Sequence, residues 1–263
     1  MSGWDGRQHQ AAAATAATAA IPAADAFPDT LPEVAARVHE DLRAHGLSRL
    51  PPMTEARFLE LAGWVGEVGL RTDLVIDPAQ EAEERRRRSS ETGRPVVYAP
   101  TELGFHTDRP TVDVIGWYCV EQDAEDGAVH LLDTADLGEH FTAAEIAALG
   151  RVELGYFQRN ALTGQEEACR APLVTSGPRG HLLYYAPWLV QEGAGGETAL
   201  LARFAAYVER KRETALVRIR LQRGEALFVD NHRLLHARGN LSPSSRRHIV
   251  RLYIACPAAA LDS

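Results

Sequence analysis

Hydrophobic residues in the first part of the chain recur at helical spacing. The segment 29–46 has an early Pro32, ends on Gly46 and carries a stripe of apolar residues on one face: Val34, Val38 and Leu42. This pattern predicts an amphipathic helix. A similar stripe predicts a second helix over 54–69: Phe58, Leu61, Trp64 and Val65. The short apolar piece between them predicts a strand, and both helices are expected to pack on a sheet.

From about residue 96 the pattern changes to short apolar runs that are typical of β-strands. The runs are 95–99, 111–120, 128–133, 181–188, 214–222, 225–229 and 248–255. Two helices interrupt them. One is opened by a capping box from Thr142 to Glu145, and the other, over 198–212, is expected to turn four residues inward: Leu201, Phe204, Ala205 and Val208. Many short strands with flanking helices predict a mainly β fold, either a sandwich or a jelly roll.

The distribution of large apolar residues predicts one domain and a tail. Residues 1–27 are rich in alanine and carry almost no large apolar side chains, so they are expected to be disordered, and residues 28–263 are expected to form a single domain. Residues 78–95 are highly charged and lack apolar periodicity. We interpret them as a solvated segment, and a lid over an active site, formed by residues 81–94, is the functional alternative.

Charge and cysteine content narrow the classes of partner. A net charge of −8 and a pI near 5.7 argue against nucleic acid as a partner, because phosphate binding needs clustered Lys and Arg. No apolar run is long enough to span a membrane, and no signal peptide is evident. Three distant cysteines without CxxC spacing favour a reducing, cytoplasmic compartment. The sequence does not fix the oligomeric state.

Two His-x-Asp triplets are candidates for metal binding. On the first predicted helix, His39 and Asp41 point about 200° apart, so they cannot share one ion. His106 and Asp108 lie at the edge of a predicted strand, where side chains at i and i+2 project from the same face. These two residues can therefore bind one metal ion together.

The C-terminal part of the chain supplies a further candidate ligand and two cations. A strand, an Asp-Asn turn and a returning segment bring in His236, and Arg247 and Arg251 fall on one face of the last strand. Arginines in an otherwise apolar strand need anionic partners, either bound ligands or structural salt bridges.

Two imidazoles and one carboxylate leave positions of an octahedral ion free for other ligands, as in iron(II) oxygenases. Zinc hydrolases use the same ligand types, but an arginine that reaches the metal site favours a dicarboxylate ligand.

Three sequence segments carry a family resemblance: GFHTD, GEALFVDNHRLLHARG and RHIVR. Over about residues 30–256 the chain resembles the taurine dioxygenase-like and clavaminate synthase-like branch of the iron(II)/2-oxoglutarate-dependent oxygenases. The resemblance implies a double-stranded β-helix, a cupin-like jelly roll, in which iron(II) is held by His106, Asp108 and His236. It also implies that 2-oxoglutarate binds Arg247, that an anionic group of a small substrate binds Arg251, and that dioxygen is the oxidant. The two arginine roles are open to exchange.

The resemblance implies hydroxylation of an unactivated C–H bond of a small polar substrate, an amino acid or natural-product intermediate, with release of succinate and CO2. Desaturation or cyclisation with the same cofactors is an alternative, and a jelly-roll metal-binding or sensor protein without turnover is another. The chain departs from the family pattern at Val129, where relatives usually have a threonine that helps to hold 2-oxoglutarate. We also expect Tyr185 and Trp188 as pocket walls.

Overall fold

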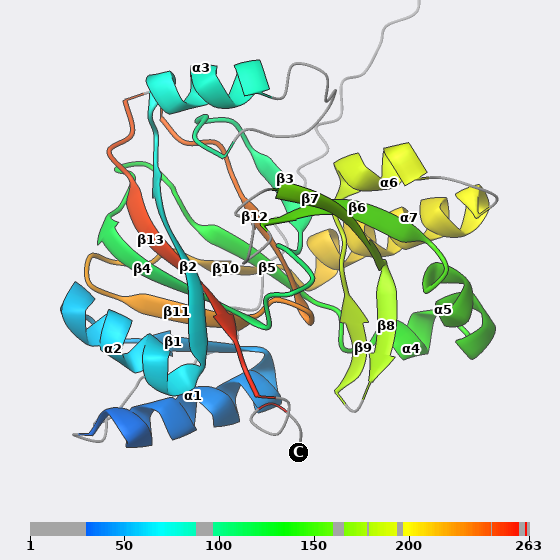
Figure 1. The fold of residues 1–263 in the computed structure, drawn as a ribbon, viewed down its shortest axis with the longest axis horizontal. Coiled ribbons are helices and arrows are strands. Elements are labelled where there is room, and N and C mark those ends of the chain that lie inside the picture. The colour runs from blue at the N-terminus through cyan, green and yellow to red at the C-terminus, as the bar shows by residue number, and fades with distance from the viewer. Residues whose placement is uncertain are drawn as a thin grey trace, which may run out of the picture.

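Two antiparallel β-sheets form the centre of the molecule (Figure 1). The structure is a computed structural model and describes residues 30–87, 97–159, 166–177, 179–193, 197–242, 244–257 and 261. The expected tail, 1–27, lies outside the described residues. The five-stranded sheet has the order β1 (Leu47–Leu50), β11 (Ala226–Asp230), β4 (Val114–Glu121), β13 (His248–Ala255), β2 (Glu67–Val75). The four-stranded sheet has the order β10 (Val217–Ile219), β5 (Val129–Asp133), β12 (Leu234–Arg238), β3 (Leu103–His106).

The inner faces of these sheets enclose one apolar cluster. Ile115 and Cys119 from β4 pack with Val129 and Leu131 from β5, and Ile249 of β13 joins them. Because side chains alternate along a strand, Arg251 lies on the same inward face of β13 as Ile249. The predicted double-stranded β-helix with flanking helices is confirmed.

Two helices cover the outer face of the five-stranded sheet (Figure 1). Helix α1 (Leu31–His45) has a proline in its first turn and ends at Gly46, whose φ of 72° is the left-handed conformation that glycine adopts without strain. It buries the predicted apolar stripe against α2 (Glu55–Val65) and the sheet. The strand predicted between the two helices is β1.

The second helix is shorter than the sequence predicts. It ends at Val65 instead of residue 69, and Glu67–Val75 form strand β2, which pairs with β13. A side chain at Gly66 would place its Cβ 2.5 Å from the backbone oxygen of Ala255, so only glycine fits this crossing. Trp64, expected on the inward face, is 55% exposed.

The outer face of the four-stranded sheet is covered by the helices and hairpins of the middle of the chain (Figure 1). These elements are α4 (Leu137–His140), α5 (Ala143–Leu149), α6 (Pro187–Gly193), α7 (Thr198–Thr214), β6 (Glu153–Arg159), β7 (Glu166–Pro172), β8 (Val174–Gly177) and β9 (Gly180–Leu183). The capping box at Thr142 and Glu145 is present. On α7, Leu201, Phe204 and Val208 are buried as predicted, but Ala205 is exposed and Tyr207 takes its place inside.

In three predicted strand runs most residues do not form a strand. In the run 214–222, only Val217–Ile219 do, as β10. The described part of the run 95–99 forms turns, and the run 181–188 is a strand only to Leu183, with α6 beginning at Pro187. The charged segment begins as helix α3 (Pro78–Arg87), and the rest of the proposed lid lies outside the described residues. Within the described ranges, no helix is long and apolar enough to cross a membrane.

Candidate metal centre

The second His-x-Asp triplet lies where β3 ends inside the barrel. His106 is the last residue of β3, and Asp108 follows it at the start of the connection to β4. The His106 Nε2 atom lies 3.8 Å from Asp108 Oδ1. Both side chains are only slightly exposed, at 11% and 12%. The structure therefore brings them together as the spacing predicts.

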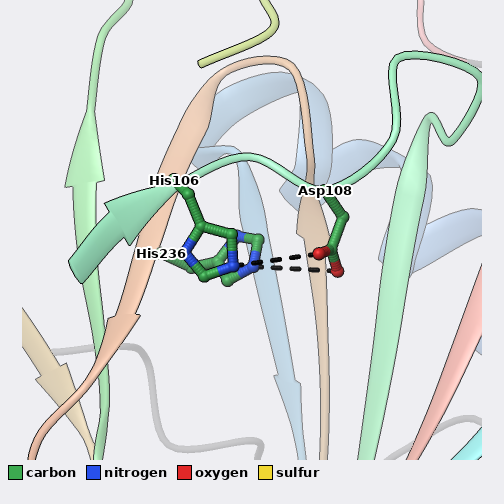
Figure 2. Close-up of side chains that lie close together, drawn as sticks. All are labelled: His106, Asp108 and His236. Carbon is green, nitrogen blue, oxygen red and sulfur yellow. Dashed lines mark ion pairs between the residues drawn. The ribbon is translucent and has the colours of Figure 1, made fainter. Parts of the chain in front are cut away.

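His236 reaches the same point from the neighbouring strand. It is paired with His106 in the register of β12 and β3, and its Nε2 lies 3.8 Å from Asp108 Oδ2 (Figure 2). The potential ligand atoms of all three residues lie within 4.8 Å of one another. In the described parts of the chain, this is the one group of three such residues close enough to hold an ion.

The protonation of these side chains suits a cation. Burial lowers the pKa of both histidines, that of His236 to about 3, so both imidazoles are neutral near pH 7. His106 donates its Nδ1 hydrogen to the Gly104 carbonyl at 2.7 Å. The Nε2 atom of this tautomer therefore keeps a lone pair that can bind a metal ion. For Asp108, burial acts to raise the pKa, but the charge of Arg251 and the nearby histidines outweigh it, and the pKa falls to about 2.

The geometry and protonation of the triad fit a divalent transition metal, because two neutral nitrogens and one ionised oxygen face one point.

The backbone of the triplet is held by residues that sequence reasoning missed. Asn231, in the turn between β11 and β12, accepts a hydrogen bond from the Asp108 amide at 2.8 Å and donates to the carbonyls of Arg109 and Val112. Thr107 exchanges hydrogen bonds with the backbone of Tyr185. These contacts fix the connection after β3. The sequence predicts a turn at Asp230-Asn231. It does not show that Asn231 contacts Asp108, which is more than a hundred residues away in sequence.

Arg251 lies directly against the metal candidates. Its Nη1 is 3.1 Å from Asp108 Oδ2, and its guanidinium stacks over the Tyr253 ring at 4.6 Å. The side chain is 14% exposed, and its Nε has no hydrogen-bond partner among the described residues. The structure thus places Arg251 in the centre, paired to one of the three candidate ligands.

Arg247 is buried without a carboxylate partner. It is 5% exposed, and its guanidinium forms no ion pair within the described residues. The Asp123 carboxylate raises the pKa of Arg247 only by electrostatic attraction over a longer distance. Arg238 on β12 is also buried, and it forms no ion pair with any described residue. Burial lowers the pKa of both groups to about 10, and Arg247 adds to the effect on Arg238, so both remain charged at neutral pH. Two neighbouring cations therefore lie in the interior.

Aromatic rings surround the histidines. The Trp188 ring lies 5.2 Å from the His106 ring, in agreement with the expected wall, and Trp117 meets the His236 ring edge-on at 5.2 Å. The side chain of Tyr185, the other expected wall, instead packs against Phe204 in the core under the four-stranded sheet.

The first His-x-Asp triplet is separate, as expected. The His39 ring bonds to the carbonyl of Val65, and Asp41 accepts from Ser48 and Arg37. Neither contributes to the metal candidates.

The fold is similar to those of solved iron oxygenases. An asparagine oxygenase in complex with Fe(II), (2S,3S)-3-hydroxyasparagine and succinate is 20% identical, with a TM-score of 0.62 over 87% of this chain and 80% of that one. The non-heme iron oxygenase OrfP, in complex with Fe and alpha-ketoglutaric acid, is 16% identical, with a TM-score of 0.59 over 87% and 84%. For a putative alpha-ketoglutarate-dependent taurine dioxygenase from Burkholderia xenovorans the values are 14%, 0.60, 89% and 86%.

A comparison with curated proteins gives no match. A family model does match: the model described as "Taurine catabolism dioxygenase TauD, TfdA family" covers residues 12–253, which is most of the chain. The expectation drawn from the three sequence segments is thereby confirmed. The chain belongs to the TauD/TfdA family of dioxygenases and is an iron(II)/2-oxoglutarate-dependent dioxygenase, with iron(II), 2-oxoglutarate and dioxygen as its reactive partners.

Proposed function

We propose that the protein hydroxylates an unactivated C–H bond of a small polar substrate, with iron(II) held by His106, Asp108 and His236. The observation that carries this proposal is the convergence of two neutral imidazoles and one ionised carboxylate on a single point inside the barrel. When bound, iron(II) with 2-oxoglutarate and dioxygen supplies the oxidation: the 2-oxo acid becomes succinate and CO2, and one oxygen atom is inserted into the substrate C–H bond.

The protein's own task is to position the reactants and exclude water. Hydrogen bonds between the backbone and the side chains of Asn231 and Thr107 hold the segment that carries His106 and Asp108 in place without a ligand. Trp188 and Trp117 line the histidines with apolar surface, which keeps the site dry. Preorganised ligands in a dry site lose little free energy to rearrangement during the reaction.

Arg247 is the proposed anchor for the distal carboxylate of 2-oxoglutarate. A buried guanidinium without an ion pair in the described protein is costly unless a ligand supplies the anion. A carboxylate accepts two parallel hydrogen bonds from a guanidinium, which fixes the orientation of the ligand.

Arg251 is the proposed contact for an anionic group of the main substrate. It lies beside Asp108, and its unpartnered Nε offers a further donor. The asparagine oxygenase and OrfP structures hold hydroxylated amino acids, so an amino acid with its α-carboxylate fits this assignment. Desaturation or cyclisation with the same cofactors is the alternative outcome, and product analysis by mass spectrometry separates these from hydroxylation.

The test of the function is anaerobic addition of iron(II) and 2-oxoglutarate, followed by oxygen. We expect the weak visible charge-transfer band of the chelate, then oxygen uptake with formation of succinate. A protein that binds the metal but neither gives the band nor forms succinate would be a metal-binding or sensor protein, and the proposal would be wrong.

The test of Arg251 is the Arg251→Ala variant. We expect it to keep the anaerobic band, because 2-oxoglutarate is held by Arg247, and to uncouple succinate formation from product formation. Its affinity for the metal should not fall, because the change removes a positive charge 3.1 Å from a ligand oxygen. If the variant loses 2-oxoglutarate while Arg247→Ala keeps it, the two arginine roles are reversed.

A further inference from the structure

Arg238 is a second buried cation, which lies near Arg247 in the space between the two sheets. It lies on β12, two residues after His236, and is 6% exposed. Because side chains alternate along a strand, Arg238 and His236 project from the same inward face of the sheet. Its Cα partner on β5 is Val129, which belongs to the apolar cluster between the sheets. Val129 has no polar group to offer a ligand there.

The guanidinium of Arg238 holds a segment of backbone that leads into the metal centre. Nη1 donates to the Val97 carbonyl at 3.2 Å, and Nη2 donates to the carbonyls of Ala99 and Thr101 at 2.7 and 2.6 Å. This segment continues into β3, which ends at His106. Three bonds from one side chain therefore fix residues 97–101 against β12.

These carbonyl bonds leave the charge of Arg238 uncompensated. Its Nε is buried without a hydrogen-bond partner, and the same is true of Arg247 Nε. Neither guanidinium forms an ion pair with a carboxylate in the described parts of the chain, and the two groups repel each other. Two adjacent buried cations are unfavourable unless an anion joins them.

We propose that Arg238 is a positioning residue for 2-oxoglutarate, which holds residues 97–101 beside the pocket and adds a second positive charge that attracts the distal carboxylate. This inference rests on the proposed function. It assigns to the protein a selectivity for a 2-oxo dicarboxylic acid over a 2-oxo monocarboxylic acid, because a ligand without the distal carboxylate leaves two buried cations without an anion.

The test compares two ligands of equal length under nitrogen. The iron(II)-loaded protein is titrated with 2-oxoglutarate and with 2-oxopentanoate, which lacks the distal carboxylate, and the charge-transfer band reports binding of each. The variants are Arg238→Gln, which removes the charge, and Arg238→Lys, which keeps it. Arg233→Gln is the control, because Arg233 also donates to main-chain carbonyls, those of Arg43 and Ala44, but its charge is already paired with Asp133 at 2.6 Å. Iron(II) affinity and thermal unfolding are measured separately for every variant.

We expect Arg238→Gln to weaken 2-oxoglutarate binding by about tenfold or more while 2-oxopentanoate binding changes little, since only the first ligand carries the missing ion partner. Arg238→Lys should retain most of the preference for 2-oxoglutarate, and Arg233→Gln should retain all of it. Should Arg238→Gln fail to fold, the ratio of the two affinities in Arg238→Lys, compared with wild type and with Arg247→Lys, carries the test.

Two results would overturn the inference. One is an Arg238→Gln protein that binds 2-oxoglutarate as wild type does. The other is an equal loss of both ligands, which would mean that Arg238 only holds the backbone. If wild type itself gives no band with 2-oxoglutarate, the proposed function fails, and that outcome is seen before any variant is made.

Discussion

The two ends of the barrel interior differ in how their charges are balanced. At the metal end, the Asp108 carboxylate meets the Arg251 guanidinium at 3.1 Å, and the two histidines are neutral. At the other end, Arg238 and Arg247 are buried without an ion pair in the described residues. The metal end is therefore preformed by the protein alone, whereas we propose that the other end is completed by a bound anion. This difference predicts that loss of a proposed metal ligand abolishes the reaction, and that mutations at the arginine end change the affinity for the co-substrate.

The largest effect is expected at the metal end, from His236→Ala. The change removes one of three proposed ligands, so iron-dependent succinate formation should be abolished and metal affinity should fall by about a hundredfold or more. Iron(II) titration and a succinate assay measure both. His39→Ala is the matched control, because His39 belongs to the other His-x-Asp triplet and bonds to the Val65 carbonyl outside the centre. A folded His236→Ala protein with normal turnover would remove His236 from the ligand set.

A smaller effect is expected at the arginine end, from Arg247→Ala. Truncating one partner of a buried guanidinium–carboxylate pair costs about 2–5 kcal/mol, so the apparent KM for 2-oxoglutarate should rise at least about tenfold. Iron(II) affinity without the co-substrate should stay near the wild-type value, because Arg247 is not among the metal candidates. Steady-state assays with varied 2-oxoglutarate give the first quantity, and anaerobic metal titration gives the second. An unchanged KM would leave 2-oxoglutarate without its proposed anchor.

The contrast between the two ends also explains what the sequence could predict. His106 and Asp108 were found because two residues apart on a strand share a face, which is a local rule. Arg247 and Arg251 were singled out by the same alternation along the last predicted strand, although β13 itself begins at His248, one residue after Arg247. Arg238 was not singled out because its proposed role depends on which strands are neighbours: β12 lies between β3 and β5, and no local pattern states this order.

The limits of local pattern also appear in the fold. The first three residues of β2, 67–69, were predicted as the end of a helix because 54–69 carries helical apolar spacing, yet β2 pairs with β13 instead. The close approach of Gly66 to Ala255 ends the helix, and this contact joins segments almost two hundred residues apart. Elements with strong local signals, such as α1 with Gly46 and α5 with its capping box, were predicted well.

The Asn231→Ala variant tests how much the residues that position the candidate ligands contribute to iron binding. Asn231→Ala leaves the Asp108 amide without its acceptor and two carbonyls without their donor, while all three candidate ligands remain. Loss of a residue that positions a metal ligand typically lowers metal affinity or activity by about tenfold to a hundredfold. We therefore expect a loss in iron(II) affinity toward the lower end of that range, with an unchanged KM for 2-oxoglutarate once the metal site is saturated. A rise in that KM at saturating metal would show that Asn231 acts on the arginine end as well.

The smallest effect is expected from Val129→Thr, which adds one hydroxyl to the arginine end at nearly constant volume. Val129 is buried and lies opposite Arg238, so the hydroxyl enters the pocket proposed for the distal carboxylate. One hydrogen bond typically contributes about 0.5–1.5 kcal/mol net, but a buried hydroxyl without a partner costs about 1–3 kcal/mol. The ligand-free variant should therefore melt at a lower temperature than wild type, and its KM for 2-oxoglutarate should fall roughly threefold to tenfold. Val114→Thr is the matched control: Val114 is buried against the helices on the outer face of the other sheet, so its substitution should lower the melting temperature and leave the KM unchanged. If Val129→Thr lowers stability equally with and without 2-oxoglutarate, the hydroxyl does not meet the ligand, and the carboxylate lies elsewhere than between Arg247, Arg238 and β5.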